Sequence, residues 1–104
     1  MIAVLFEVNV KPAGQARYLA LAAGLAPLLN KAPGFIAIER FQSLAHPGKI
    51  LSLSWWEDEQ AVQAWHQHPA HRAAQQEGRD SLFEHYRIVL ANITREYSVP
   101  GGGK

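Results

Sequence analysis

Three histidines that could carry out acid–base chemistry stand close together in the second half of the chain: His66, His68 and His71. Histidine titrates near neutral pH, so it can accept or donate a proton as a general base or acid. His71 is the best candidate because it follows Pro69 and shares a helix face with Gln75, four residues later. The alternative role is structural, a buried histidine that hydrogen bonds to the backbone or to a side chain of the last strand.

The same three histidines do not predict a metal site. Their spacings of two, three and five residues do not place all of them on one helix face, and Pro69 breaks the helical register between them. No glutamate at a recognised spacing completes a site, and the chain has no cysteine. We therefore expect no metal, and we interpret the histidines as solvated residues at helix ends, with His46 as a turn residue.

A tryptophan, a serine and an arginine are further candidates for binding a flat ligand. Trp56 could form an aromatic wall for a planar ring, and the small Ser52 on the same strand face would leave room beside it. Arg87, if it points into an apolar pocket, would stabilise an enolate or phenolate and lower its pKa. The alternative for Trp56 is a core anchor beneath closely packed helices. The alternative for Arg87 is an ion pair across strands with one of three glutamates, Glu39, Glu84 or Glu96.

Hydrophobic periodicity predicts the elements that position these side chains. Alternating apolar residues predict four strands, over residues 2–10, 35–44, 50–56 and 84–99. Apolar residues at helical spacing predict one helix over residues 13–31 and two short helices between residues 58 and 78. The order of elements is therefore β-α-β-β-α-β, with the second helix split in two.

Residues with special backbone or capping chemistry mark the helix ends. Pro27 should kink or divide the first helix. Asp58 and His68 stand where a side chain can cap the two short helices at their N-termini. Gly78 should end the second short helix in a left-handed conformation.

This order of elements predicts an α+β fold of the ferredoxin-like, split βαβ type, with an antiparallel sheet and helices on one face. The other face stays apolar, since Leu51, Leu53 and Trp55 alternate with the residues of the helix side. A bare apolar sheet face is unstable in water, so we expect two copies to pack sheet to sheet as a homodimer. The single domain spans residues 1–99, and residues 100–104 form a glycine-rich tail that we expect to be disordered.

The composition narrows the classes of protein that remain. The chain has 104 residues, 48% of them hydrophobic, and a formal net charge of +1. This charge favours neither a nucleic-acid partner nor an anionic membrane surface. The apolar start is interrupted by Glu7, so it is too short for a signal peptide or a membrane span. We expect a cytoplasmic protein that binds no nucleic acid and no membrane.

Three stretches of the chain resemble a known family: PGFIAIERFQSL, GKILSLSWWEDEQAVQAWHQHPAHRAAQQEGR and YRIVLANITREY. They are similar to the antibiotic biosynthesis monooxygenase (ABM) domain, of the dimeric α+β barrel superfamily. The resemblance covers residues 2–97, nearly the whole chain. It implies that two ferredoxin-like subunits form a dimeric α+β barrel.

The resemblance also suggests roles for individual residues. Trp56 occupies the place of a tryptophan that lines the substrate pocket of the polyketide oxygenases, and Ser52 stands where these enzymes have an asparagine. Trp65 matches the helix tryptophan of the haem-degrading branch. Gln75 falls on the haem-ligating histidine of that branch, and glutamine is a poor axial ligand. Asn9 is a pocket candidate because haem-degrading relatives place an asparagine near this part of the first strand.

The resemblance implies a cofactor-independent monooxygenase acting on a small planar phenolic or quinol-like substrate and molecular oxygen. Such a substrate, once deprotonated, gives an electron to oxygen itself, so neither a metal nor a flavin is required. The catalytic residues would be His71 and Arg87, and the substrate-binding residues Trp56, Trp65, Ser52, Gln75 and Asn9. Two alternatives stay open: a dimeric small-ligand-binding or stress-response module without turnover, and, less favoured, a haem-binding or haem-degrading protein that uses His71.

Overall fold

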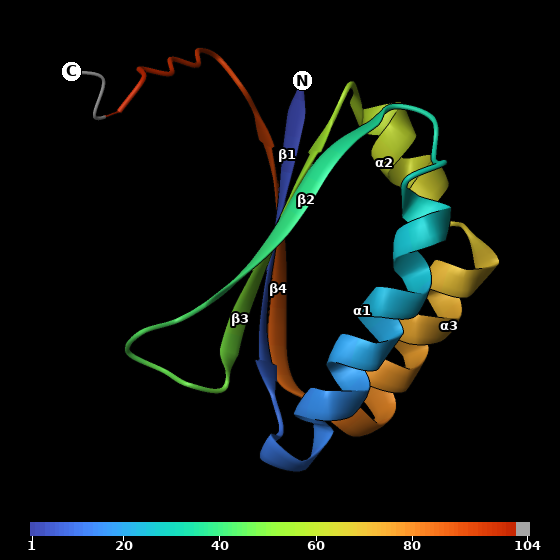
Figure 1. Ribbon diagram of the computed structural model, residues 1–104. Helices are drawn as coiled ribbons and strands as arrows, with labels where there is room; N and C mark the ends of the chain where they lie inside the picture. The colour runs from blue at the N-terminus through green and yellow to red at the C-terminus, as the bar shows by residue number, and fades with distance from the viewer. Residues whose placement is uncertain (102–104) are drawn as a thin grey trace.

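The computed structural model describes residues 1–101, which form one antiparallel sheet with helices on one face (Figure 1). The strands are β1 (Ile2–Val10), β2 (Phe35–Gln42), β3 (Lys49–Trp56) and β4 (Phe83–Asn92). The α-helices are α1 (Gln15–Leu29), α2 (Glu59–His66) and α3 (Pro69–Glu77), with a short 3₁₀ turn at Pro12–Gly14 and a π-helical turn at Gly78–Leu82. The predicted α+β, ferredoxin-like fold with a split second helix is confirmed.

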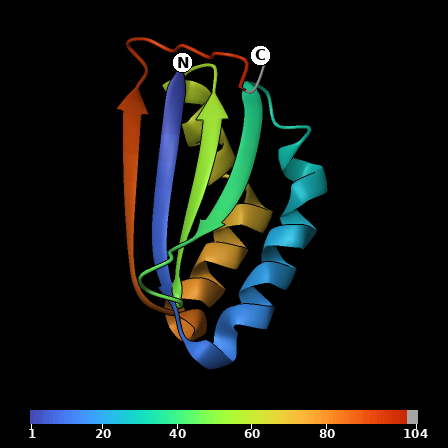
Figure 2. The same ribbon diagram turned by 60° about the vertical axis from the view of Figure 1, so that its left-hand side comes forward.

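The strands lie in the order β2-β3-β1-β4, all neighbours antiparallel, as Figure 2 shows from the open side of the sheet. This order arises because each helical connection crosses over one strand, so that β1 and β3 lie in the centre. In register, Val4 pairs with Ser54 and Phe6 pairs with Ser52. The side chains of these four residues therefore share the helix face of the sheet.

The hydrophobic core on the helix face falls into two clusters, one toward each end of the sheet. We call them the Tyr18 cluster (Phe6, Val8, Val10, Tyr18, Ile50, Leu82 and Phe83) and the Trp56 cluster (Ile2, Val4, Leu29, Trp56, Val62 and Trp65). Ser52 and Ser54 lie between them on β3 and are themselves buried. The middle of the helix face thus has small polar side chains where a closed core would have large apolar ones.

Two predicted helix caps are confirmed. The Asp58 side chain accepts a hydrogen bond from the Ala61 amide at 2.8 Å at the start of α2. The His68 Nδ1 atom accepts one from the Ala70 amide at 3.1 Å at the start of α3. Because His68 uses Nδ1 as a cap, its ring is fixed at the turn between the two short helices.

Other details of the helices differ from prediction. Pro27 does not divide α1, which continues to Leu29, because a proline in the last turn removes only one helical hydrogen bond. Gly78 has a right-handed φ of −58° and continues into the π-helical turn, so the predicted left-handed end is wrong. Glycine is needed there for space, since a Cβ atom would approach the Phe83 ring to 2.4 Å.

The last strand is shorter than predicted. β4 ends at Asn92 because its partner β1 begins at Ile2, and the last backbone contact runs from the Ile93 amide to the Met1 carbonyl at 3.1 Å. The second strand likewise ends at Gln42 instead of residue 44. Of the predicted tail 100–104, the last three residues lie outside the described part of the chain. In residues 1–101 no helix has the length and apolar character needed to span a bilayer.

Substituting alanine for glycine at two positions should have opposite effects on stability. Gly34 has a φ of +81°, and a Cβ atom there would lie 2.5 Å from the Ala61 Cβ, so Gly34→Ala should destabilise the fold by about 1–3 kcal/mol. Gly24 lies inside α1 with nothing within 4 Å of a new Cβ, so Gly24→Ala should stabilise it by about 0.5–1 kcal/mol. Urea unfolding of both variants measures this, and a shift of the same sign in both would contradict the prediction.

Candidate functional site

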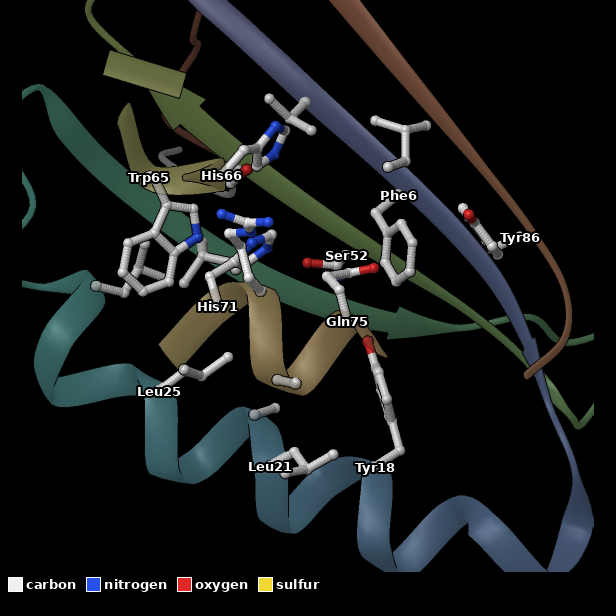
Figure 3. A pocket seen from close by; sticks show the side chains of 18 of the residues that line it. Phe6, Tyr18, Leu21, Leu25, Ser52, Trp65, His66, His71, Gln75 and Tyr86 are labelled. Carbon is white, nitrogen blue, oxygen red and sulfur yellow. The ribbon is translucent and has the colours of Figure 1, made fainter. Parts of the chain in front are cut away.

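A cavity of about 640 Å³ lies between the sheet, α1 and α3, at the gap between the two core clusters (Figure 3). Its floor includes Ser52, Ser54 and Phe6 on the sheet, and α1 contributes Leu21 and Leu25. Figure 3 shows His71 and Gln75 entering it from α3, with Tyr18 on one side and Trp65 and His66 on the other. The volume is in the range of pockets that bind small organic molecules.

The local sequence explains why the middle of the fold stays hollow. Ser52 and Ser54 are only 8% and 7% exposed, yet neither side chain reaches far toward the helices. Opposite them α1 presents Ala22 and Ala26, which also line the cavity. Small residues on both surfaces leave space that the larger residues of the two clusters cannot enter without breaking their own packing.

His71 combines burial with an unsatisfied polar atom. Its Nδ1 atom is buried and has no hydrogen-bond partner within the described residues. The ring stacks on His66, with centroids 5.1 Å apart and planes at 19°, and lies 5.3 Å from the Trp65 ring. Buried polar atoms are nearly always paired in native proteins, so the orphaned nitrogen marks the His71 ring, other atoms of which line the cavity, as a functional candidate.

The environment of His71 keeps its imidazole neutral. Burial, and to a lesser degree the neighbouring charges of His66 and His68, lower the pKa of His71 from 6.5 to about 4, while the His66 backbone acts in the opposite direction. Burial also lowers the pKa of His66. At neutral pH both stacked rings are therefore uncharged, and His71 is available as a proton acceptor.

The histidines thus differ from their predicted solvated state. His66 and His71 line the cavity and His68 caps α3. Within residues 1–101, no group of three histidine, cysteine, aspartate or glutamate side chains is arranged to hold a metal ion. The face-to-face stacking of His66 and His71 also turns their rings alongside each other and not toward a common point.

The two tryptophans line the cavity as parts of its walls. Trp56 is 2% exposed, its indole N–H donates to the Ser54 hydroxyl at 2.9 Å, and its ring meets Phe35 edge-on. Trp65 is almost as buried and faces His71. Trp56 is therefore a core anchor, the alternative role considered for it, and its 2% exposure leaves very little of its surface accessible from the cavity.

Two predicted site residues lie on the opposite face of the sheet, so the expectation that Arg87 points into the pocket is corrected. Arg87 pairs in register with Glu7 and donates to its carboxylate at 2.5 Å, and Lys49 approaches the same carboxylate at 3.0 Å. Arg87 and Lys49 lower the pKa of Glu7. Asn9, also on the outer face of β1, is not among the cavity residues. Arg87 therefore has the alternative role, an ion pair across strands, with a glutamate that was not among those proposed.

Several cavity residues were not predicted. Tyr18 and Tyr86 bring phenol groups to it, and three arginines line it, Arg40, Arg72 and Arg79. Successive residues of a strand point to opposite faces, so Tyr86 and Arg87 lie on opposite faces of β4. This alternation is the sequence signal that could have identified Tyr86 as a cavity residue. Five of the seven predicted site residues do line the cavity: His71, Trp56, Trp65, Ser52 and Gln75.

Comparison with known proteins agrees with this architecture. The family model for antibiotic biosynthesis monooxygenase matches residues 1–77. A jasmonate monooxygenase ABM of Pyricularia oryzae is 40% identical over 94 residues, which are 90% of this chain but only 44% of that protein, so the chain spans less than half of it. The protein YqjZ of Bacillus subtilis is 29% identical, covering 90% of this chain and 80% of its own length. A solved antibiotic biosynthesis monooxygenase structure superposes with a TM-score of 0.80 at 18% identity, covering 91% of this chain and all of that one, and this likeness shows the fold.

The buried His71 should make stability depend on pH. The unfolded chain takes up a proton near pH 6.5, but the folded protein resists protonation until about pH 4. The free energy of unfolding should therefore fall as the pH decreases from 6.5 to 4. We expect His71 to account for about 1–2 kcal/mol of this loss, because the partial exposure of its ring reduces the effect. In urea unfolding at pH 7 and pH 4.5, His71→Gln should lose less stability than the wild type.

The exposed His46 supplies the control, because His46→Gln also removes one histidine. The His46→Gln variant should lose as much stability between pH 7 and pH 4.5 as the wild type does. If His71→Gln and His46→Gln behave alike, the ring of His71 is not buried as described.

Proposed function

The chain belongs to the antibiotic biosynthesis monooxygenase family, and from this premise we propose that it is a cofactor-independent monooxygenase acting on a small planar phenol or quinol. The observation that supports this most directly is the unpartnered, buried Nδ1 atom of His71 in a cavity walled by aromatic rings. A flat ring fits between such walls, and its hydroxyl group would pair with His71 once the imidazole turns to present a nitrogen to the cavity.

His71 acts as the base in this proposal. At neutral pH its ring is uncharged and can accept the phenolic proton. The phenolate formed beside it then favours the charged imidazolium, because opposite charges stabilise each other strongly in a dry cavity. Trp65 and the Ser52 region hold the ring in position, and Gln75 offers an amide that can donate to the anion.

The substrate supplies all the electrons that oxygen requires. For an anthrone-like substrate, the phenolate transfers one electron to O₂, and the two radicals combine at the activated CH₂ carbon to form a hydroperoxide. Loss of water then leaves a C=O group, so one oxygen atom enters the product and the other leaves as water. The protein contributes desolvation, orientation and the proton transfer through His71.

We also propose that the protein works as a homodimer joined through the outer face of the sheet. Leu51, Leu53 and Trp55 of β3 are half-buried there, and Phe41 and Val89 on the flanking strands are 43% and 37% exposed. The helices cover only the other face (Figure 1). An apolar surface of this extent on a small domain is typical of a self-association interface.

The relative named jasmonate monooxygenase suggests jasmonate as a second candidate substrate. Jasmonate has a cyclopentanone ring and no phenol, so its hydroxylation would take two electrons from a separate reductant such as a reduced nicotinamide or flavin. Oxygen uptake with jasmonate that depends on such a reductant would favour this substrate over a phenol.

The first test is oxygen uptake with a panel of quinols and anthrones. We expect turnover by the wild type without added cofactor, and a loss of at least about 100-fold in kcat/KM for His71→Ala, the upper part of the range for a general base. The acid limb of kcat/KM should lie at about pH 4 because His71 stays neutral down to that pH. The exposed His46→Ala variant should keep full activity.

Other results would point elsewhere. Tight binding of a panel compound with no oxygen uptake would indicate a ligand-binding module, and a haem titration whose Soret shift is lost in His71→Ala would indicate haem binding. An unchanged rate in His71→Ala would exclude His71 as the base.

The dimer is tested by placing a charge on the outer face. Leu53 lies in the middle of that face, and Leu53→Glu should produce monomers in sedimentation velocity at micromolar concentration, because a buried unpaired carboxylate is costly. Leu44→Glu introduces the same change in the hairpin turn, where Leu44 is fully exposed, and should leave the dimer intact. A wild type that sediments as a monomer would refute the proposal.

A further inference from the structure

The cavity lining is positively charged and contains no carboxylate. Of the 25 residues that line it, three are arginines (Arg40, Arg72 and Arg79), two are histidines and none is aspartate or glutamate. The whole chain is nearly balanced, with 10 lysines and arginines against 9 aspartates and glutamates. The excess of cations is thus a local property of the cavity and does not follow from the composition.

Within residues 1–101, none of the three arginines forms a salt bridge with an acidic group. The salt bridges among residues 1–101 join Arg17 to Glu77, and Lys49 and Arg87 to Glu7, and all three lie outside the cavity. Arg79 donates one hydrogen bond to the Gln76 side chain at 2.9 Å, which leaves most of its fork of donors unused. Cations that protein carboxylates leave unneutralised beside an apolar cavity favour an anionic ligand.

The position of the arginines separates them from the floor of the cavity. Arg72 and Arg79 are seven residues apart and so lie two turns apart on one side of the helical segment, with Gln75 and Gln76 between them. Both are exposed, whereas the floor residues are buried. Tyr86, 37% exposed, lines the same cavity from β4. The arginines therefore stand at the open side, and the neutral His71 stands further in.

We infer that the substrate carries a carboxylate, which Arg72 and Arg79 hold at the open side of the cavity while its ring enters toward His71. This inference rests on the proposed function and adds the charge of its substrate. A guanidinium binds a carboxylate through two parallel hydrogen bonds, so the arginines would set the direction in which the molecule enters. Arg40, on β2 beside Ser52, adds to the positive potential from the other side.

The test compares an acid with its own ester. The probe is 6-hydroxy-2-naphthoic acid, a planar phenol with a carboxylate at the opposite end, and the control ligand is its methyl ester. Isothermal titration calorimetry at pH 7 should give at least about tenfold tighter binding of the acid to the wild type, the value of one charge-assisted contact. Raising the salt concentration should weaken the binding of the acid and leave that of the ester unchanged.

The protein variants are Arg72→Gln, Arg79→Gln and the double variant. Each single change should weaken binding of the acid, and the double variant should lose most of its preference for the acid over the ester, because only Arg40 remains. Arg95→Gln is the matched control, since Arg95 is exposed, outside the cavity, and loses the same charge. Thermal unfolding of each variant verifies that the fold is intact, and the unchanged affinity for the ester verifies that the cavity is.

The outcomes separate this inference from the proposed function. If the ester binds as tightly as the acid and the arginine variants change neither, the inference is wrong, and oxygen uptake with neutral quinols still decides the function. If the acid binds through the arginines but no phenol consumes oxygen, the anionic ligand stands and the monooxygenase proposal falls. If no probe binds to the wild type, both the inference of an anionic substrate and the proposed monooxygenase function are wrong.

Discussion

Hydrophobic packing on the helix side of the sheet is interrupted at Ser52 and Ser54, and the cavity depends on that interruption. The Trp56 cluster and the Tyr18 cluster bury the two ends of the helices against the sheet. Between them, the small side chains of serines on β3 and of alanines on α1 line the cavity. Close packing at both ends thus holds the middle open, so stability and the binding site come from the same arrangement.

The electrostatics of the cavity follow from the same geometry. Removal from water keeps His71 and His66 neutral, and their stacking means that a charge on one ring disfavours a charge on the other. The fixed positive charges are on arginines, which stay ionised in any protein environment. The site therefore keeps a proton acceptor in its interior and cations at its opening, two functions that would interfere if both depended on histidine.

The sequence predicted the fold well because the alternation along β1 and β3 and the capping residues are local signals. It predicted the site less well where a choice between two faces was needed. Along β4 the set Tyr86, Ile88 and Leu90 is as apolar as the set Val89 and Ala91, so alternation separated Arg87 from Tyr86 without saying which side faces the helices. Asn9 was misplaced for another reason: it was taken from the resemblance to haem-degrading relatives, whereas the alternation along β1 puts it with Glu7 on the outer face. The right-handed backbone at Gly78 also had no local signal, because its cause is the ring of Phe83, brought near by the chain reversal.

In the proposed homodimer, the charge cluster of Glu7, Arg87 and Lys49 would lie within the interface on the outer face of the sheet. A purely hydrocarbon surface permits many alignments of similar energy, since apolar contact has no direction. Three linked ionic groups in that surface permit few, because an alignment that buries them against aliphatic side chains leaves their remaining hydrogen-bonding capacity unmet. In the proposed homodimer, the Arg87 pair with Glu7 would therefore favour one alignment of the two sheets over shifted ones.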